Sequence, residues 1–265
     1  MNAPKSRVDL TQFFERVTRA PARVLMLDYD GTLAPFQVRP ERAIPYPGVE
    51  ELLDGIMAAE RSRVVIVSGR SVGDLVPLLN LSRRPELWGA HGWERLLPDG
   101  RGARIPLDVN VRRQLDEGER RARELARAGA RLETKPASVA LHWRGTSALA
   151  AAKIRNALPR LWEPLAAEGE LELLEFDGGL ELRARGCNKQ HAVKAVLSET
   201  PGDAAVAYLG DDLTDEDAFL AVKPRGLAVL VRSKFRETAA DAWIRPPREL
   251  IAFLNRWRDA CREAR

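Results

Sequence analysis

The sequence predicts an α/β protein: a Rossmann-like core built on a parallel sheet, with a smaller α/β unit inserted into it. Four short apolar runs are continuous rather than alternating, which is typical of strands buried on both faces of a sheet. These runs are residues 24–27, 64–67, 206–209 and 227–231. Stretches with helical periodicity separate them, and strands that alternate with helices favour a doubly wound parallel sheet.

Two helices of the predicted core follow from apolar residues spaced three and four apart. The apolar positions are Val49, Leu52, Leu53 and Ile56 in the first helix and Ala192, Val193, Val196 and Leu197 in the second. The second helix also has a marked beginning, because Gly186 breaks the preceding strand, Asn188 is a candidate N-cap and Lys189 opens the helix.

The inserted unit is predicted from the chain between Ser68 and Lys189, which is longer than one sheet crossover needs. Its pattern is a helix followed by two strands, twice over. The expected elements are a helix at 108–128, strands at 131–134 and 138–143, a helix at 147–167, and strands at 171–176 and 180–184. Asp177-Gly178-Gly179 is expected to form a tight hairpin turn. We expect residues 105–184 to form a cap on a core made of residues 1–104 and 185–265.

The charge pattern argues against a nucleic-acid partner. The chain has 42 Lys and Arg against 38 Asp and Glu, a net charge of +4. The most basic stretch, residues 111–131, interleaves its arginines with acidic residues, and Glu119 and Arg123 are four apart. This pattern predicts a solvated amphipathic helix rather than a basic binding face.

The composition also bounds the compartment and the partners. No apolar run is long enough to span a bilayer, and the first residues lack the apolar segment of a secretory signal. The two cysteines, Cys187 and Cys261, lie far apart and give no disulfide framework. We therefore expect a cytoplasmic monomer without a membrane partner.

Polar side chains follow three of the predicted strands at the point where each strand ends. Asp28 and Asp30 follow the first strand, Ser68 follows the second, and Asp211 and Asp212 follow the third. Ligands of open α/β sheets bind beyond the carboxyl ends of the strands. These residues should therefore converge on one crevice.

The acidic residues of this crevice predict a metal and a phosphate. Asp28 and Asp30 are two apart, so they point the same way on an extended backbone and repel each other unless a cation intervenes. With Asp211 they make an all-oxygen site, and Mg²⁺ favours carboxylates, waters and a substrate phosphate. Lys189, at a helix N-terminus, adds a candidate anion site.

Four features of the chain together resemble the haloacid-dehalogenase superfamily. They are the motif "DYDGT" (28–32), the serine after the second strand, the lysine before a helix and the motif "GDD" (210–212). The resemblance implies a core of that type. It implies that Asp28 is a nucleophile that forms an aspartyl-phosphate and that Asp30 is the general acid and base. Ser68 and Lys189 would hold phosphoryl oxygens.

By the same resemblance, Mg²⁺ would be bound by Asp28, by the backbone carbonyl of Asp30 and by Asp211. Thr32 would hold the turn or a phosphoryl oxygen. For Asp212 and Asp215, a metal role and a structural role stay equally open. Farther along, Thr214 and Asp217 have the spacing of a capping box, with Glu216 and Asp217 as first-turn residues of a helix.

Within that superfamily, six motifs occur in the order found in trehalose-6-phosphate phosphatases, from residue 24 to 219. They are "DYDGTLAPF", "VSGR", "GAHGWERLLPDG", "KPASVALHWRG", "LELRARG" and "GDDLTDEDAF". The resemblance implies a sugar-phosphate substrate, trehalose 6-phosphate. The implied substrate-binding residues are Thr32 and Arg70 in the core, His91, Gly92 and Glu94 at the junction of core and cap, and Lys135, His142, Arg144, Glu181 and Arg183 in the cap.

Other interpretations of the cap residues stay open. His142 and Arg144 could be the solvated face of a strand, and Glu181 and Arg183 a surface cross-strand pair. The chain also departs from the family pattern at three positions, Gln190, Trp143 and Ala184. These departures leave the phosphatase chemistry untouched but bear on the sugar, so a phosphatase of another glycosyl phosphate is an alternative function. A catalytically silent sugar-phosphate-binding protein is a more remote alternative, because binding alone does not require the nucleophile and metal ligands that the motifs supply.

Overall fold

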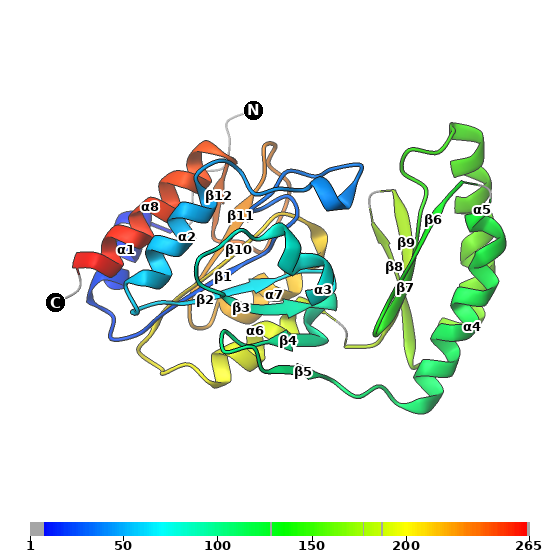
Figure 1. Cartoon of the computed structure of the whole chain (residues 1–265), viewed down its shortest axis with the longest axis horizontal. Coiled ribbons are helices and arrows are strands. Elements are labelled where there is room, and N and C mark those ends of the chain that lie inside the picture. Colours follow the sequence, from blue (N-terminus) through cyan, green and yellow to red (C-terminus); the bar gives the residue numbers. More distant parts are fainter. Residues whose placement is uncertain (1–7, 128, 177, 187, 264–265) are drawn as a thin grey trace. The chain divides into compact units, whose positions relative to one another are not determined.

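The computed structural model of the chain describes residues 8–127, 129–176, 178–186 and 188–263 (Figure 1). The chain divides into two compact units, Met1–Ala103 with Asn188–Arg265, and Arg104–Cys187. The first unit holds an eight-stranded sheet in the order β12-β11-β10-β1-β2-β3-β4-β5. Neighbouring strands from β12 to β3 pair in parallel, whereas β3 and β4 are antiparallel. The predicted α/β class with a parallel core is confirmed.

The central strands match the continuous apolar runs closely. They are β1 (Arg23–Leu27), β2 (Arg63–Val67), β10 (Ala205–Gly210) and β11 (Leu227–Val231). The outer strands were not predicted and are short: β3 (Glu86–Gly89), β4 (Glu94–Leu96), β5 (Gly102–Arg104) and β12 (Ala242–Ile244). Both faces of the sheet are buried, since Leu25 and Leu27 belong to one apolar cluster and Val24 and Met26 to the other.

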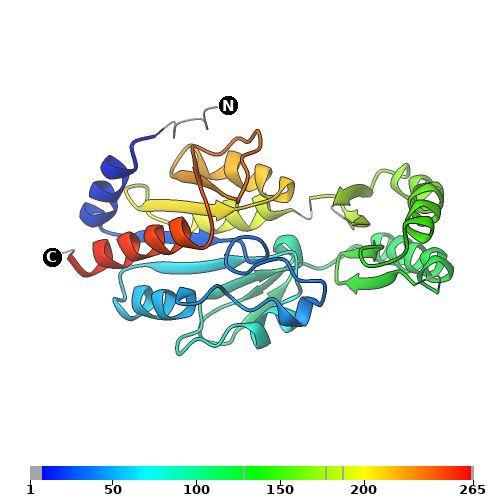
Figure 2. The same cartoon turned by 90° about the horizontal axis from the view of Figure 1, so that it is seen from above.

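One face of this sheet is covered by α1 (Leu10–Arg19), α2 (Val49–Ala58) and α8 (Arg248–Glu263), whose apolar residues share a single core with the strands. The C-terminal α8, red in Figures 1 and 2, packs against both α1 and α2. On the other face lie α6 (Lys189–Ser198) and α7 (Glu216–Val222). The predicted apolar faces of α2 and α6 are buried as expected.

The remaining helices of the first unit are short connections near the strand ends. They are α3 (Val72–Leu75) and the 3-10 turns η1 (Pro40–Arg42), η2 (Val76–Leu78), η3 (Ala90–Gly92) and η4 (Leu213–Asp215). In η3, Ala90 and His91 both have positive φ, of 47° and 56°. That conformation is uncommon outside glycine, so the surrounding contacts must hold this turn.

The second unit is a four-stranded antiparallel sheet in the order β6-β7-β9-β8 with two helices. The helices are α4 (Val109–Ala126) and α5 (Ala148–Ala166), capped by Asp108 and Ser147. The strands are β6 (Arg131–Lys135), β7 (Ser138–His142), β8 (Leu171–Phe176) and β9 (Gly179–Ala184), within a residue of their expected bounds. Of the predicted hairpin turn, Asp177 lies outside the described residues.

The strands of the second unit present one apolar and one polar face. Leu182 of β9 lies against Gly118 of α4, which places the apolar side under the helices. By strand alternation, Glu181 and Arg183 lie on the opposite face, together with Lys135 and His142. Four of the five predicted cap residues therefore share one face of this sheet.

Within the described parts of the chain, no helix has both the length and the apolar character needed to cross a bilayer.

Candidate active site

The candidate site lies at the carboxyl ends of β1 and β10. Asp28 follows β1 directly, and its backbone N–H donates to the carbonyl of Leu209 on β10 at 2.8 Å. Carboxylate oxygens of Asp28, Asp211 and Asp215 lie within 4.8 Å of one another, and all three residues are buried. Residues far apart in the sequence thus meet at the edge of the sheet that the sequence predicted.

Lys189 is the cation at the centre of this acidic group. Its Nζ lies 2.5 Å from Asp28 Oδ1 and 2.8 Å from Asp215 Oδ1, and only 3% of the residue is exposed. The helix start places it there, because Asn188 caps α6 as predicted by accepting the N–H of His191. Burial favours loss of the Lys189 proton, but the carboxylates of Asp215 and Asp28 outweigh it and raise the pKa of Lys189.

The carboxyl groups show the electrostatic cost of placing several acids around one lysine. Burial raises the pKa of Asp28 to about 7, against the opposing effect of Lys189. Burial and the neighbouring Asp28 also raise the pKa of Asp211. Burial opposes ionisation of Asp215 too, but its ion pair with Lys189 lowers the pKa of Asp215 below its usual value. A bound cation would favour the ionised form of all three groups.

The structure assigns Asp215 a structural task that the sequence left open. Its carboxylate accepts hydrogen bonds from the backbone N–H groups of Asp211 and Asp212, each at 3.0 Å, and from the hydroxyl of Tyr208 at 2.6 Å. Asp215 therefore makes the capping interaction of this loop. The prediction that Thr214 and Asp217 form a capping box was wrong. Asp217 does lie in the first turn of α7, as expected.

Tyr208 is a site residue that the sequence analysis missed. Its side chain is fully buried, and its hydroxyl is the group that completes the set of donors around Asp215. A signal was present, because Tyr208 is a residue with a polar end in the middle of a strand that is otherwise apolar. A buried hydroxyl of this kind requires a partner.

The residues around Asp28 leave polar atoms suited to a metal and a phosphoryl group. Among the described residues, Asp28 Oδ2 and Thr32 Oγ1 are buried and have no hydrogen-bond partner. Gly31, with φ of +87°, lets the motif loop approach Asp211, since a Cβ there would lie 2.2 Å from Asp211 Oδ2. An orphaned carboxylate oxygen within an all-oxygen cluster fits a hard divalent cation.

Asp30 and Ser68 are held by the same arginine. Arg70 donates from Nε and Nη2 to the two carboxylate oxygens of Asp30, both at 2.6 Å. Its backbone N–H donates to Ser68 Oγ at 3.1 Å. The predicted general acid and base, the predicted phosphate ligand and the predicted substrate-binding arginine are thus adjacent.

The three residues predicted at the junction of core and cap stand in the first unit, around η3. Glu94 Oε2 accepts the N–H of Val72 at 2.8 Å, which anchors the segment after Ser68. The imidazole of His91 lies against Gly69, where a Cβ would come within 2.6 Å of its ring. Gly92, with φ of +99°, approaches the N-terminus of α6. A contact with a substrate stays a prediction for these residues.

The predicted cap residues belong to the second unit. Ser138 donates to Glu181 at 2.5 Å, and Lys135 lies 3.7 Å from the same carboxylate oxygen of Glu181. His142 Nε2 lies 2.6 Å from Glu133. Arg144 follows β7, where its backbone N–H reaches the carbonyl of Gly178 at 3.3 Å.

The alternative interpretation of Glu181 and Arg183 as a surface cross-strand pair was wrong. The two residues lie on one strand, and only 2% and 8% of their surfaces are exposed. Arg183 pairs instead with Glu172 of β8, at 2.7 Å.

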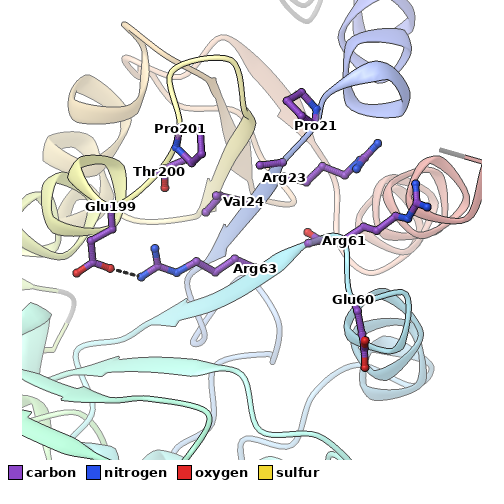
Figure 3. A pocket seen from close by; sticks show the side chains of 11 residues that line it. Pro21, Arg23, Val24, Glu60, Arg61, Arg63, Glu199, Thr200 and Pro201 are labelled. Atoms are coloured by element: carbon purple, nitrogen blue, oxygen red, sulfur yellow. Dashed lines mark hydrogen bonds and ion pairs between the residues drawn. The ribbon is translucent and has the colours of Figure 1, made fainter. Parts of the chain in front are cut away.

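A cavity of about 430 Å³ lies at the opposite end of β1 and β2, around Arg23, Arg63 and Thr200 (Figure 3). The charged groups there already have partners in the protein. Figure 3 shows Arg63 directed toward Glu199, which it binds at 2.7 Å, and Arg23 donates to backbone carbonyls. This cavity lies at the amino ends of the strands, where α/β sheets do not carry their catalytic residues.

Comparison with known proteins agrees with this geometry. Residues 26–242 match the family described as trehalose-phosphatase. A trehalose-phosphate phosphatase of Mycobacterium ulcerans is 30% identical over 256 residues, which cover 89% of this chain and 61% of that protein. The chain therefore spans about three fifths of the length of this curated relative.

Two solved structures share the fold. The C-terminal domain of the C. albicans trehalose-6-phosphate phosphatase aligns with a TM-score of 0.83 and 21% identity, covering 98% of this chain and 99% of that one. A haloacid-dehalogenase-like hydrolase from B. subtilis aligns with a TM-score of 0.62 and 14% identity, covering 88% and 99%. The core is thus of the haloacid-dehalogenase type, and the chain belongs to the trehalose-phosphatase family.

Proposed function

We propose that the chain is a Mg²⁺-dependent phosphatase that hydrolyses trehalose 6-phosphate through an aspartyl-phosphate on Asp28. The observation that carries the proposal is the state of the Asp28 carboxylate. One oxygen is held by Lys189, and the other is buried without a partner among the described residues. A nucleophile needs an oxygen of this kind, fixed in place and not engaged by the protein.

Residues of the site fit a divalent cation. Asp28 and Asp211 would hold Mg²⁺ through their carboxylates, and the resemblance adds the carbonyl of Asp30. When bound, Mg²⁺ neutralises negative charge on the carboxylates and on the phosphoryl oxygens. Asp215 is better suited to hold Lys189 and the loop of Asp211, because its oxygens already accept several hydrogen bonds.

The first half of the reaction is the transfer of the phosphoryl group to Asp28. A carboxylate oxygen of Asp28 attacks phosphorus, and the bond from phosphorus to the sugar oxygen breaks. The sugar oxygen keeps the electron pair and takes a proton from the carboxyl group of Asp30. Lys189 and Ser68 donate to the phosphoryl oxygens. The hydroxyl of Thr32, which has no hydrogen-bond partner among the described residues, is a further donor.

The second half releases phosphate. A water oxygen attacks phosphorus and gives a proton to the carboxylate of Asp30, and the electron pair of the broken phosphorus–oxygen bond returns to Asp28. Asp30 is then protonated again and can serve as the acid of the next cycle. The products are trehalose and inorganic phosphate.

The polar face of the second unit is proposed to bind the sugar. Lys135, His142, Glu181 and Arg183 share this face, and such polar side chains suit a disaccharide with many hydroxyls. A site that hydrogen-bonds hydroxyls also rejects substrates that lack them. Arg144, His91, Gly92 and Glu94 are proposed contacts on the strength of the family motifs alone.

A substrate panel tests the proposed function. Trehalose 6-phosphate should be hydrolysed with the highest kcat/KM among glycosyl phosphates, with glucose 6-phosphate far poorer. Phosphate release should cease in EDTA and return with Mg²⁺. A higher kcat/KM for another glycosyl phosphate would favour the alternative substrate. Binding of trehalose 6-phosphate without phosphate release, in the presence of Mg²⁺, would instead indicate a silent binding protein. A cytoplasmic location and a monomeric state stay predictions.

Glu181→Ala should separate sugar recognition from chemistry. Removal of one hydrogen bond to a charged group costs about 1.5–3 kcal/mol, which is roughly a 10- to 150-fold loss of kcat/KM on trehalose 6-phosphate. Hydrolysis of 4-nitrophenyl phosphate, which has no sugar, should be nearly unchanged. Glu124→Ala, at an exposed position of α4, is the matched control and should affect neither substrate. An equal loss on both substrates would show that Glu181 does not recognise the sugar.

A further inference from the structure

Arg70 and Asp30 form a short bidentate ion pair. Two donors of one planar guanidinium reach the two oxygens of one carboxylate, each at 2.6 Å. The side chains are 13% and 27% exposed, so water competes little for the arginine end of this pair. Bidentate arginine–carboxylate pairs fix the plane of the carboxylate as well as its position.

The fold holds Arg70 in this position from several sides. Its backbone N–H is bound by Ser68 Oγ at 3.1 Å, and its carbonyl accepts the N–H of Ala90 at 2.6 Å. Its guanidinium carbon lies 5.7 Å from the centroid of the Tyr29 ring. Tyr29 is itself buried and donates its hydroxyl to the carbonyl of Ala43 at 2.7 Å. Arg70 is therefore oriented before any substrate arrives.

We infer that Arg70 is a positioning residue for the second half of the reaction: it holds Asp30 as an aligned carboxylate that accepts the proton of the attacking water. This inference rests on the proposed function. A guanidinium has donors and no acceptor, so a bidentate contact with it fixes both the position and the plane of the Asp30 carboxylate. In that half-reaction the water oxygen bonds to phosphorus, its proton passes to Asp30, and the electron pair of the broken bond returns to Asp28.

A positioning role and a substrate-binding role of Arg70 have different kinetic consequences. If Arg70 bound the phosphoryl group, its loss would weaken the capture of every substrate and lower kcat/KM. If Arg70 acts through Asp30 on water attack, its loss slows only the breakdown of the phosphorylated enzyme. That step follows the release of the first product and therefore affects kcat without affecting kcat/KM.

The test uses Arg70→Ala and 4-nitrophenyl phosphate, whose leaving group departs without a proton from the enzyme. We expect kcat to fall by about 10- to 100-fold, because positioned acid–base groups contribute about 10²- to 10⁴-fold and Asp30 itself is still present. kcat/KM should stay within about threefold, so KM should fall with kcat. A burst of nitrophenol and phosphate bound to Asp28 should appear in the first turnover.

Three further variants keep the test independent of folding. Arg70→Lys, which retains a charge but not the bidentate contact, should give an intermediate kcat. Arg83→Ala removes an exposed arginine that pairs with Glu60 and should leave both constants unchanged. In the background of Asp30→Asn, Arg70→Ala should cause no further loss, because the two residues act on one step.

The outcomes separate this inference from the function on which it rests. A wild-type protein that hydrolyses no phosphomonoester would overturn the proposed function and the inference together. An active wild type whose Arg70→Ala variant loses kcat/KM as much as kcat would overturn the inference alone. A further loss on the Asp30→Asn background would do the same, since it would show a role for Arg70 apart from Asp30.

Discussion

Asp28→Asn is expected to abolish phosphate release, by at least about 10⁴-fold in kcat, because the amide cannot form the phosphorylated intermediate. The fold should survive the change. Asparagine has nearly the same size, and its amide oxygen can still accept the hydrogen bond from Lys189. The measurement is phosphate release from trehalose 6-phosphate in Mg²⁺, with a thermal melt of the same sample.

The control for the Asp28→Asn variant is a check of its chemical identity. Mass spectrometry should show that the introduced asparagine has not been deamidated to aspartate during the assay. Turnover that persists in a sample of the variant free of deamidation, well above that of a blank, would contradict a nucleophilic role for Asp28. The site would then have to act by direct attack of water on the phosphate.

Lys189→Ala should reduce both activity and stability. Removing the cation leaves Asp28 and Asp215 as uncompensated buried carboxylates, and breaking a buried ion pair costs about 3–5 kcal/mol of unfolding free energy. Loss of a donor to the transferred phosphoryl group adds roughly a 10²- to 10³-fold fall in kcat. Trehalose 6-phosphate and 4-nitrophenyl phosphate should suffer alike, since they share the phosphoryl group.

Lys194→Ala is the matched control on the same helix. Lys194 is exposed and its Nζ donates to Gln190, so its removal should change neither the melt nor kcat. A Lys189→Ala variant that loses stability but hydrolyses 4-nitrophenyl phosphate normally would show that Lys189 is structural only.

Sequence predicted the parts of the fold that depend on local pattern. Continuous apolar runs predicted β1, β2, β10 and β11. The polar residues that follow these runs predicted the edge of the sheet at which Asp28 and Asp211 meet. Local residue chemistry was also sufficient to predict the start of α6, where Asn188 is the N-cap residue and Lys189 is the first residue of the helix. These features need only strand burial, helix periodicity and capping.

The elements that were missed have weaker or unused signals. β12 is only three residues long, and β3, β4 and β5 are four residues or fewer, too short for a pattern to establish. α8 was missed although Leu250, Phe253, Leu254 and Trp257 have helical spacing and are buried. That signal was present and unused.

Within the site, sequence could not predict contacts that depend on how two loops meet. Arg70 and Asp30 are forty residues apart, and their pairing depends on the turn around Ala90. The same holds for Asp215, whose partners come from α6, β10 and its own loop. Motif spacing names such residues but does not show which of them touch.

The most direct test of the central claim follows phosphate during a single turnover. Trehalose 6-phosphate labelled with ³²P is mixed with an excess of the Mg²⁺-loaded protein and quenched in acid at successive times. The account predicts label bound to Asp28, at no more than one per chain, with trehalose released before inorganic phosphate appears. Label on another residue, or trehalose and phosphate released together with no protein-bound label at any time, would contradict it.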